Sequence, residues 1–444
     1  MILNAENILQ CLNHTPTGKT IKTWWLAYSG GVDSQVLLHL LSQTKLDVRA
    51  VYIDHGLQAV SGQWAEHCAQ SCQQLNIPFQ TIAVNACAKN GESPEASARH
   101  ARYQALATLV EEHHCLLTAQ HQDDQAETFL LQLFRGAGAA GLAAMPFCDS
   151  FSKGLHMRPL LEFTQNDILT YAKQYDLNWV EDPSNQDDRY DRNYLRNRIM
   201  PLLKQRWPAI DKIISTVAKQ QAENKQLLEY YAAEELKYIH ADPDSLPVDA
   251  LLDFDEPHLR NILRYWIKQQ NIPVPSRKIL QQIMQQMFTE KEDAKSKVSW
   301  SGFDMYRYKG ELIVVPAIHH DDKQIFNWDG QQPLMIASLS KQLTMKKTTG
   351  RGLKADIIGK DLTVCFRQGG EHIKPAGRNG THSLKKLFQE AAIPVWQRSR
   401  IPLVYLGDAL IAVAGYWIAD DYQADKGSAG LEPVLTESSD KSII

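Results

Sequence analysis

Long hydrophobic runs are missing from this 444-residue sequence. No apolar stretch approaches the length of a membrane span, and the N-terminal residues 1–7 do not lead from a basic segment into an apolar core. Membrane helices and secretory signals need such segments. The sequence therefore predicts a protein of the cytoplasm that has no membrane partner.

Cysteine is also scarce. The seven cysteines are odd in number and scattered, and no two of them form a CxxC pair. Cys68 and Cys72 lie four residues apart with no second pair nearby, which argues against a structural zinc site. We expect buried free thiols and no disulfide framework.

Excess charge of one sign is absent overall, because the net charge is only −4. That average hides an asymmetry. Residues 341–400 carry thirteen Lys and Arg against four Asp and Glu, whereas residues 401–444 carry two against seven. The basic segment, with a net charge of +9, also contains Phe366, Trp396 and several glycines. This mixture indicates a surface that follows a nucleic-acid backbone, although a solvated basic face is the alternative.

The most informative motif is Ser29-Gly30-Gly31-Val32-Asp33-Ser34. It lies between the apolar run 24–28 and the leucine-rich run 36–41. A strand that turns directly into a helix aims backbone N–H groups and the positive helix end at one point, which suits a phosphate. The motif lacks the Lys-Ser/Thr ending of a Walker A loop and the third glycine of a dinucleotide fingerprint. The alternative is an ordinary Gly-Gly turn with Ser34 as a helix cap.

The first 205 residues alternate short apolar runs with helical patterns, which predicts a doubly wound parallel sheet covered on both faces. Expected strands are 24–28, 48–53, 79–84 and 115–119, and expected helices are 36–41, 64–75, 95–113 and 125–134. In such α/β sheets ligands bind at the carboxyl ends of the strands. The Ser29–Ser34 motif lies at one of those ends.

The pattern changes after Pro208, where apolar residues recur at helical spacing in three long segments and a strand pair, 298–306 and 311–315, follows. We predict an α/β domain at 1–208, a mainly helical domain at 209–318 and a polar linker at 319–341. A small, basic α+β domain is expected at 342–430, with strands at 362–366, 403–406 and 409–416, and a loose acidic tail at 431–444.

A second constellation lies at residues 119–128, where Asp123, Asp124 and Glu127 follow a predicted strand and open a helix. Asp124 and Glu127 are three residues apart and share a helix face. Acids at a helix start are otherwise often only caps. A cluster of arginines, Arg192, Arg196 and Arg198, lies near the end of the domain. The alternative to a functional role for this cluster is a solvated or salt-bridged helix.

These motifs together resemble those of a known family. They are SGGVDS, Asp54–Leu57, Glu95–Tyr103, HQDDQAET with RGAGAAGL, RPLL, WVEDPSN, the Arg192–Arg198 segment and, near the C-terminus, Gly370–Ile373, Leu384–Phe388 and Ile393–Arg398. The set is similar to tRNA(Ile)-lysidine synthetase, a family of the PP-loop superfamily, whose members split ATP into AMP and pyrophosphate on an adenine nucleotide α-hydrolase-like fold. The match runs over nearly the whole chain.

The resemblance implies an AMP-forming ligase that uses ATP and Mg²⁺. It would adenylate C2 of the wobble cytidine of an isoleucine tRNA with a CAU anticodon, through attack by the base oxygen, and free lysine would then displace AMP to give lysidine. Single-stranded anticodon bases can be splayed out to reach such a site. The oligomeric state stays open, with a homodimer as one option.

The resemblance also assigns roles to residues. ATP would contact Ser29, Gly30, Gly31, Val32, Asp33 and Ser34, and Mg²⁺ would contact Asp33 and Asp123. Catalytic roles fall to Asp33, Asp124, Glu127 and Arg99, with Arg102 as the alternative to Arg99 and the identity of the general base left open among the acids. Contacts with tRNA fall to Arg192, Arg196, Arg198, Lys385 and Lys386.

Two other functions compete with this interpretation. A PP-loop tRNA thiolase would use the same nucleotide loop, but it needs cysteine chemistry that the missing CxxC pairs argue against. A non-catalytic RNA-binding module with a decayed nucleotide site is opposed by the intact loop and acidic block.

Charge reversal at Lys385 and Lys386 is expected to weaken tRNA binding and to flatten its dependence on salt, because fewer counterions are released. The affinity for ATP should not change. Filter binding over a range of salt concentrations measures both constants, and an unchanged tRNA affinity would contradict the assigned role.

Overall fold

The computed structural model describes residues 2–13, 20–56, 61–85, 94–239, 241–288, 296–318 and 320–437. Leu57, Cys87 and the predicted tail beyond residue 437 lie outside these ranges. The chain divides into two compact units, Met1–Leu228 and Glu229–Ile444. Within the described ranges, no helix has both the length and the apolar character needed to cross a membrane.

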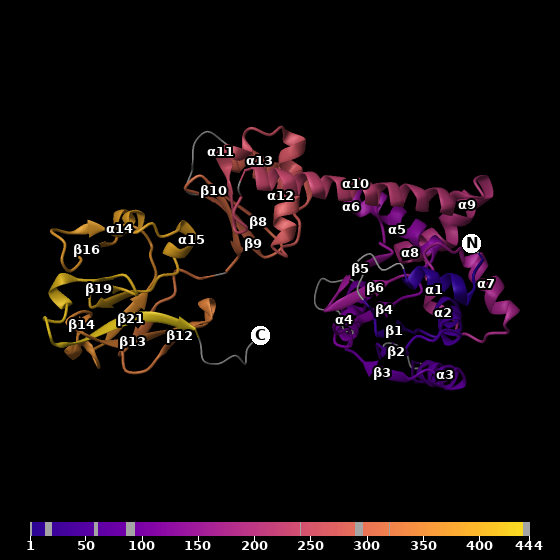
Figure 1. The fold of residues 1–444 in the computed structure, drawn as a ribbon. Helices are drawn as coiled ribbons and strands as arrows, with labels where there is room; N and C mark the ends of the chain where they lie inside the picture. Colours follow the sequence, from indigo (N-terminus) through magenta and orange to yellow (C-terminus); the bar gives the residue numbers. More distant parts are fainter. Residues whose placement is uncertain are drawn as a thin grey trace. The chain divides into compact units, whose positions relative to one another are not determined.

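The first unit is built on a six-stranded sheet in the order β3-β2-β1-β4-β6-β5, which can be followed in Figure 1. The first five strands in this order are parallel, and β5 pairs antiparallel with β6 at the edge. The predicted doubly wound parallel sheet is confirmed. The strands are β1 (Thr23–Ala27), β2 (Val48–Asp54), β3 (Phe79–Ala83), β4 (His114–Leu117), β5 (Cys148–Phe151) and β6 (Gly154–Met157).

Both faces of this sheet are covered, as its continuous apolar strands require. Trp24 and Leu26 of β1 belong to one buried cluster, and Trp25 points into another. The first cluster also contains side chains of α1 (Ala5–Asn13), α2 (Val32–Ser42), α3 (Ser61–Gln74) and α7 (Gln165–Gln174). The second contains Leu106 of α4 (Pro94–Ala107). The described cysteines are all free, and Cys68, Cys72 and Cys115 are buried in agreement with expectation.

A third cluster joins the helix after β4 to the end of the unit. Ala126 and Phe129 of α5 pack against Met200 of α9 and against Ile214 and Ala218 of α10. The elements of this region are α5 (Gln122–Phe134), α6 (Ala139–Leu142), the 3₁₀ turn η1 (Pro183–Gln186), α8 (Asp191–Tyr194), the π-helical turn η2 (Leu195–Ile199), α9 (Met200–Arg206) and α10 (Ile210–Tyr238). This packing places α9 and the first turns of α10 beside α5.

The second unit begins with helices on a small antiparallel sheet of order β7-β10-β9-β8. The expected strand over residues 298–306 is in fact two strands, because Ser301 and Gly302 both adopt positive φ and reverse the chain. The elements are β7 (Ser245–Pro247), α11 (Val248–Leu251), α12 (Glu256–Gln269), α13 (Arg277–Met287), β8 (Lys297–Trp300), β9 (Phe303–Tyr308) and β10 (Glu311–Pro316).

The C-terminal region of this unit is rich in antiparallel strands. Its sheets have the orders β11-β15-β18-β19-β20, β12-β13-β21-β14 and β16-β17. The bounds are β11 (Phe326–Trp328), β12 (Leu334–Ile336), η3 (Ala337–Leu339), β13 (Lys341–Thr349), β14 (Leu353–Lys354), η4 (Ala355–Ile357), β15 (Leu362–Cys365), β16 (His372–Ile373), β17 (His382–Ser383), α14 (Leu384–Glu390), α15 (Val395–Arg398), β18 (Leu403–Leu406), β19 (Ala409–Val413), β20 (Trp417–Ile418), η5 (Asp420–Tyr422) and β21 (Ala429–Glu437).

Two expectations about this region were wrong. The predicted linker at 319–341 contains β11 and β12, which pair with β15 and β13. The predicted loose tail at 431–444 begins inside β21, which pairs with β13 along its whole length. In β21 the apolar residues Leu431, Pro433, Val434 and Leu435 are buried or partly buried, so the strand is half-buried although its charge suggests a solvated segment.

Candidate active site

The Ser29–Ser34 loop joins β1 to α2 and has the geometry of an anion-binding turn. Gly30 adopts a φ of +81°, which favours glycine, and Gly31 is the N-cap of α2. Because glycine has no side chain, no capping oxygen competes for the amides of the first helical turn. The loop is held from within, since Ser34 Oγ lies 3.2 Å from the Ser29 amide and 3.1 Å from Ser29 Oγ.

The loop is also supported from outside. The carbonyl of Gly30 accepts a hydrogen bond of 2.9 Å from the amide of Val180, in the WVEDPSN motif. A Cβ at Gly30 would lie 3.0 Å from Sγ of Cys68. The loop is thus clamped between α3 and the Val180 segment, which fixes the direction of its amides.

His121 connects this loop to the acidic helix α5. It follows β4, caps the start of α5, and its side chain is only 3% exposed. Its Nε2 lies 3.7 Å from Asp33 of the loop and 3.4 Å from Asp124, and its Nδ1 lies 3.6 Å from Asp123. β1 and β4 are neighbours at the point where the strand order reverses, and their carboxyl ends bring these groups together.

The electrostatics of the cluster follow from burial and from mutual pairing. Burial alone would lower the pKa of His121, but the surrounding carboxylates of Asp124, Asp123 and Asp33 outweigh it and raise that pKa to about 9. Burial also raises the pKa of the Asp33 carboxyl, an effect that His121 opposes. The imidazolium therefore offsets part of the repulsion among three acids.

Two arginines pair with acids of α5. Arg196 donates from Nε to Glu127 (2.6 Å) and from Nη2 to both Glu127 (2.8 Å) and Asp124 (2.9 Å). Arg192 lies 3.3 Å from Glu127 and donates to Thr128 at 2.6 Å. Glu127 is almost fully buried, and burial raises its pKa although Arg196 opposes the shift.

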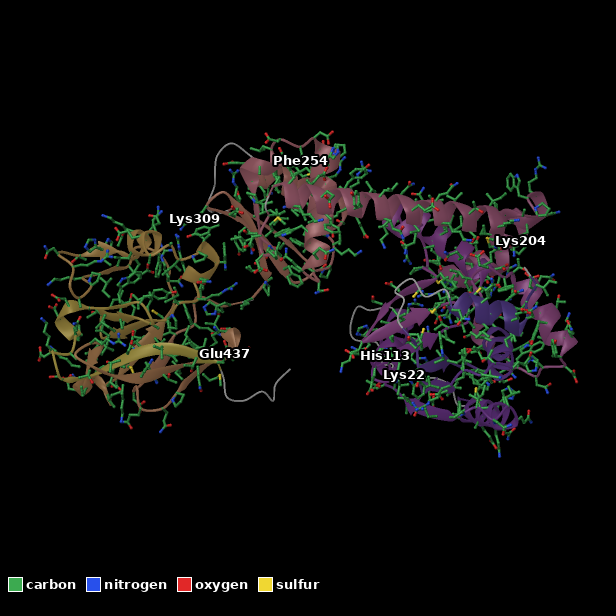
Figure 2. The ribbon with its side chains drawn as sticks, in the orientation of Figure 1. Lys22, His113, Lys204, Phe254, Lys309 and Glu437 are labelled. Carbon is green, nitrogen blue, oxygen red and sulfur yellow. The ribbon has the colours of Figure 1, made fainter. Side chains whose placement is uncertain are left out.

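Lys204 bridges Asp123 to Asp211, the acid in the first turn of α10, with 2.8 Å to the latter. Figure 2 labels Lys204 at this junction of α9 and α10. Asp123 also accepts a hydrogen bond of 2.8 Å from the amide of Gln165. Burial opposes ionisation of Asp123, but the bonds from His121, Lys204 and Gln165 hold its pKa well below the usual range.

A third network lies at the end of β6. His156 Nε2 is 2.7 Å from Thr118 Oγ1, and its Nδ1 is 3.2 Å from Arg158 of the RPLL motif. Burial, together with Arg158 and Arg99, lowers the pKa of His156 to about 3, so the ring is neutral. Arg158 donates to the carbonyl of Pro146 at 2.7 Å.

The structure brings some predicted site residues together and separates others. Asp33, Asp123, Asp124 and Glu127 form one continuous cluster with the loop. Arg99 is exposed on α4 and lies over the ring of Tyr103 at 5.0 Å, and among the described residues no hydrogen bond or ion pair joins it to the Ser29–Ser34 loop. Lys385 and Lys386 lie in the other unit, both exposed on α14.

Partners within the chain engage two sets of predicted site residues. Arg192 and Arg196 pair with the acids of α5, and the exposed Arg198 pairs with Asp188 at 2.7 Å. These pairs agree with the salt-bridged alternative, and contact of the three arginines with tRNA stays a prediction. Asp123 does not fit a metal-ligand role, because Lys204 and the Gln165 amide engage its two oxygens.

Of the two predicted metal ligands, Asp33 and Asp123, only Asp33 fits Mg²⁺. Its Oδ1 is buried and has no hydrogen-bond partner in the described part of the chain, and carboxylate oxygen is the ligand type that Mg²⁺ prefers. In the same residues, no group of three or more His, Cys, Asp or Glu side chains forms an all-protein metal site.

Sequence reasoning missed His121 and Lys204 as members of the site. His121 carried a signal, because it stands between a strand end and two acids. Lys204 carried none, since its two partners are set by the packing of α9 against α5 and α10.

Comparisons with known proteins agree with one another over most of the chain. Three family models match: a "PP-loop domain" over residues 3–203, a "TilS substrate binding domain" over 246–313 and a "TilS substrate C-terminal domain" over 362–435. Among curated relatives, the tRNA(Ile)-lysidine synthase of Coxiella burnetii is 42% identical over 90% of both chains. Those of Methylococcus capsulatus and Edwardsiella ictaluri are 38% and 37% identical, over 90% and 91% of this chain and 93% and 92% of theirs.

Replacing His121 with Gln is expected to cost stability in a pH-dependent way. A group whose folded pKa is raised stabilises the protein fully below its ordinary value of about 6.5, and this contribution is lost as pH rises through about 9. The difference in free energy of unfolding between wild type and His121→Gln should therefore shrink between pH 6.5 and 9.5. Urea unfolding at several pH values measures it, and a constant difference would contradict the charged assignment.

Proposed function

This chain belongs to the tRNA(Ile)-lysidine synthase family, and from that membership and the site geometry we propose that it is an ATP-dependent ligase forming lysidine on an isoleucine tRNA. The substrates would be ATP, free lysine and a tRNA with a CAU anticodon, all of which are found in the cytoplasm. The observation that supports this most is the contact of His121 with both the phosphate-type loop and the acidic helix.

In the first step the cytosine O2 attacks the α-phosphorus of ATP and pyrophosphate leaves. The amides at Gly31 and at the start of α2, with the hydroxyls of Ser29 and Ser34, would donate hydrogen bonds to the phosphate oxygens. Asp33 would hold Mg²⁺, which supplies positive charge beside the phosphates when bound. His121 keeps Asp33 in place from the α5 side.

In the second step the ε-amine of lysine attacks C2 of the activated base. The new C–N bond replaces the C–O bond to the phosphate, and AMP leaves with that oxygen. Because the ammonium has an ordinary pKa of ~10.4, a carboxylate must bind it and accept its proton. Asp124 and Glu127 are the candidates, and burial raises the pKa of Glu127, although Arg196 opposes the shift.

The second unit would also bind the tRNA. Lys385 and Lys386 are exposed on α14, in the segment with a net charge of +9. Their ammonium groups suit phosphate contacts that position the tRNA without reading its bases.

The thiolase alternative is disfavoured by the state of the cysteines. Burial raises the pKa of Cys68 and of Cys72 to about 12, so neither is a reactive thiolate at neutral pH.

Mass spectrometry of nucleosides from a purified isoleucine tRNA, incubated with the protein, ATP and lysine, should show cytidine converted to lysidine, with stoichiometric release of pyrophosphate. Labelled lysine should enter the tRNA and labelled sulfur should not. Release of pyrophosphate without a modified nucleoside would contradict the second step, and neither product would contradict the whole proposal.

Gly30→Ala is expected to weaken ATP binding by about tenfold or more, because the positive φ costs ~1–2 kcal/mol for a residue with a Cβ and the added carbon meets Cys68. Gly62→Ala is the matched control, since that exposed glycine of α3 has no atom within 4 Å of the new Cβ. Equal ATP affinity in the two variants would argue against the loop as the nucleotide site.

A further inference from the structure

Two buried acids of α5 already hold a cation that belongs to the chain. Asp124 and Glu127 have side chains 14% and 2% exposed, and both bind the guanidinium of Arg196. Glu127 receives two of its hydrogen bonds, at 2.6 and 2.8 Å, in a forked arrangement. Because a buried carboxylate without a partner is costly, this pair of acids requires a cation at all times.

The cation is more exposed than the acids. The side chain of Arg196 is 32% exposed, whereas those of Asp124 and Glu127 are 14% and 2% exposed. Arg196 also lies on the π-helical turn η2, between α8 and α9. A π turn is a local irregularity in a helix and is frequent at functional sites. Of the three side chains in this contact, that of Arg196 therefore reaches solvent most.

We propose that Arg196 occupies the position of the substrate ammonium in the ligand-free protein, and that lysine binds by replacing it on Asp124 and Glu127. This inference rests on the proposed lysine-coupling function. One cation replaces another, so the charge of the buried cluster is conserved during the exchange. Arg192 keeps its contacts with Glu127 and Thr128 throughout.

The exchange sets the affinity and the selectivity of the site. Free lysine must displace forked, charge-assisted hydrogen bonds. Its affinity is therefore lower than it would be if no cation occupied the two carboxylates. A neutral amino acid cannot compete, because Asp124 and Glu127 would lose the guanidinium of Arg196 without receiving another cation in its place. Arg196 thus excludes molecules that lack a cation at the end of the side chain and acts as a specificity-determining residue.

The test is equilibrium dialysis of radiolabelled L-lysine against the full-length chain without ATP or tRNA. Arg196→Gln should bind lysine at least about tenfold more tightly than wild type, since the competitor is gone. Arg196→Lys, which keeps the charge but loses the fork, should fall between the two. The matched control is Arg189→Gln, which removes an exposed arginine paired only with Asp187.

Unchanged or weaker lysine binding by a folded Arg196→Gln variant would overturn the inference. If loss of the pair destabilises that variant, lysine should raise its unfolding midpoint more than it raises that of wild type, and an equal or smaller rise would also overturn it. Glu127→Gln separates this failure from failure of the proposed function. That variant should lose lysine binding, and normal binding by it would place the lysine site elsewhere.

Discussion

The neutralisation of buried acid at the ends of β1 and β4 is the constraint on which the rest of the first unit depends. Asp33, Asp123, Asp124 and Glu127 lie in one cluster, and each meets at least one cation from His121, Arg196 or Lys204. Unpaired, such charges would oppose folding by several kcal/mol each. The packing of η2, α9 and the first turn of α10 beside α5 meets this requirement, because these elements carry Arg196, Lys204 and Asp211.

The same arrangement serves chemistry because the charges are fixed before any substrate arrives. Asp33 of the loop and Asp124 of α5 both approach Nε2 of His121, and Asp123 approaches its Nδ1. A reaction that first transfers a nucleotidyl group and then needs a base can therefore use neighbouring groups without a large rearrangement. Burial in this cluster raises the pKa of Glu127. Burial also acts to raise the pKa of Asp123, but the bonds from His121, Lys204 and Gln165 outweigh it and hold that pKa low, so neighbouring acids acquire different roles.

Much of the fold could be predicted from local patterns. The apolar run before Ser29, the glycines within the loop and the helical spacing after it specify a strand, a turn and a helix with little help from distant residues. The acidic block at 119–128 has the same kind of local signature. Parallel pairing of β1 and β4 then brings the two segments to one edge, which the doubly wound pattern already implied.

The partners within the site could not be predicted in this way. Arg196 is 72 residues from Asp124, and Lys204 is 81 residues from Asp123, so no periodicity links them. Their contacts follow from the packing of Phe129 and Ala126 against α9 and α10, which depends on tertiary fit. The half-buried β21 was not predicted for a related reason. Its acidic residues suggested a solvated tail, whereas its backbone pairs with β13, a strand that lies far away in the sequence.

The Asp123–Lys204–Asp211 bridge has one more consequence, which concerns inheritance. Its members come from α5, α9 and α10, and Lys204 is the cation that both acids share. Loss of Lys204 would leave Asp211 without this partner, whereas Asp123 would keep His121 and the amide of Gln165. Descendants of this chain that lose Lys204 should therefore also change at position 211, so that drift at one position is tied to compensation at the other.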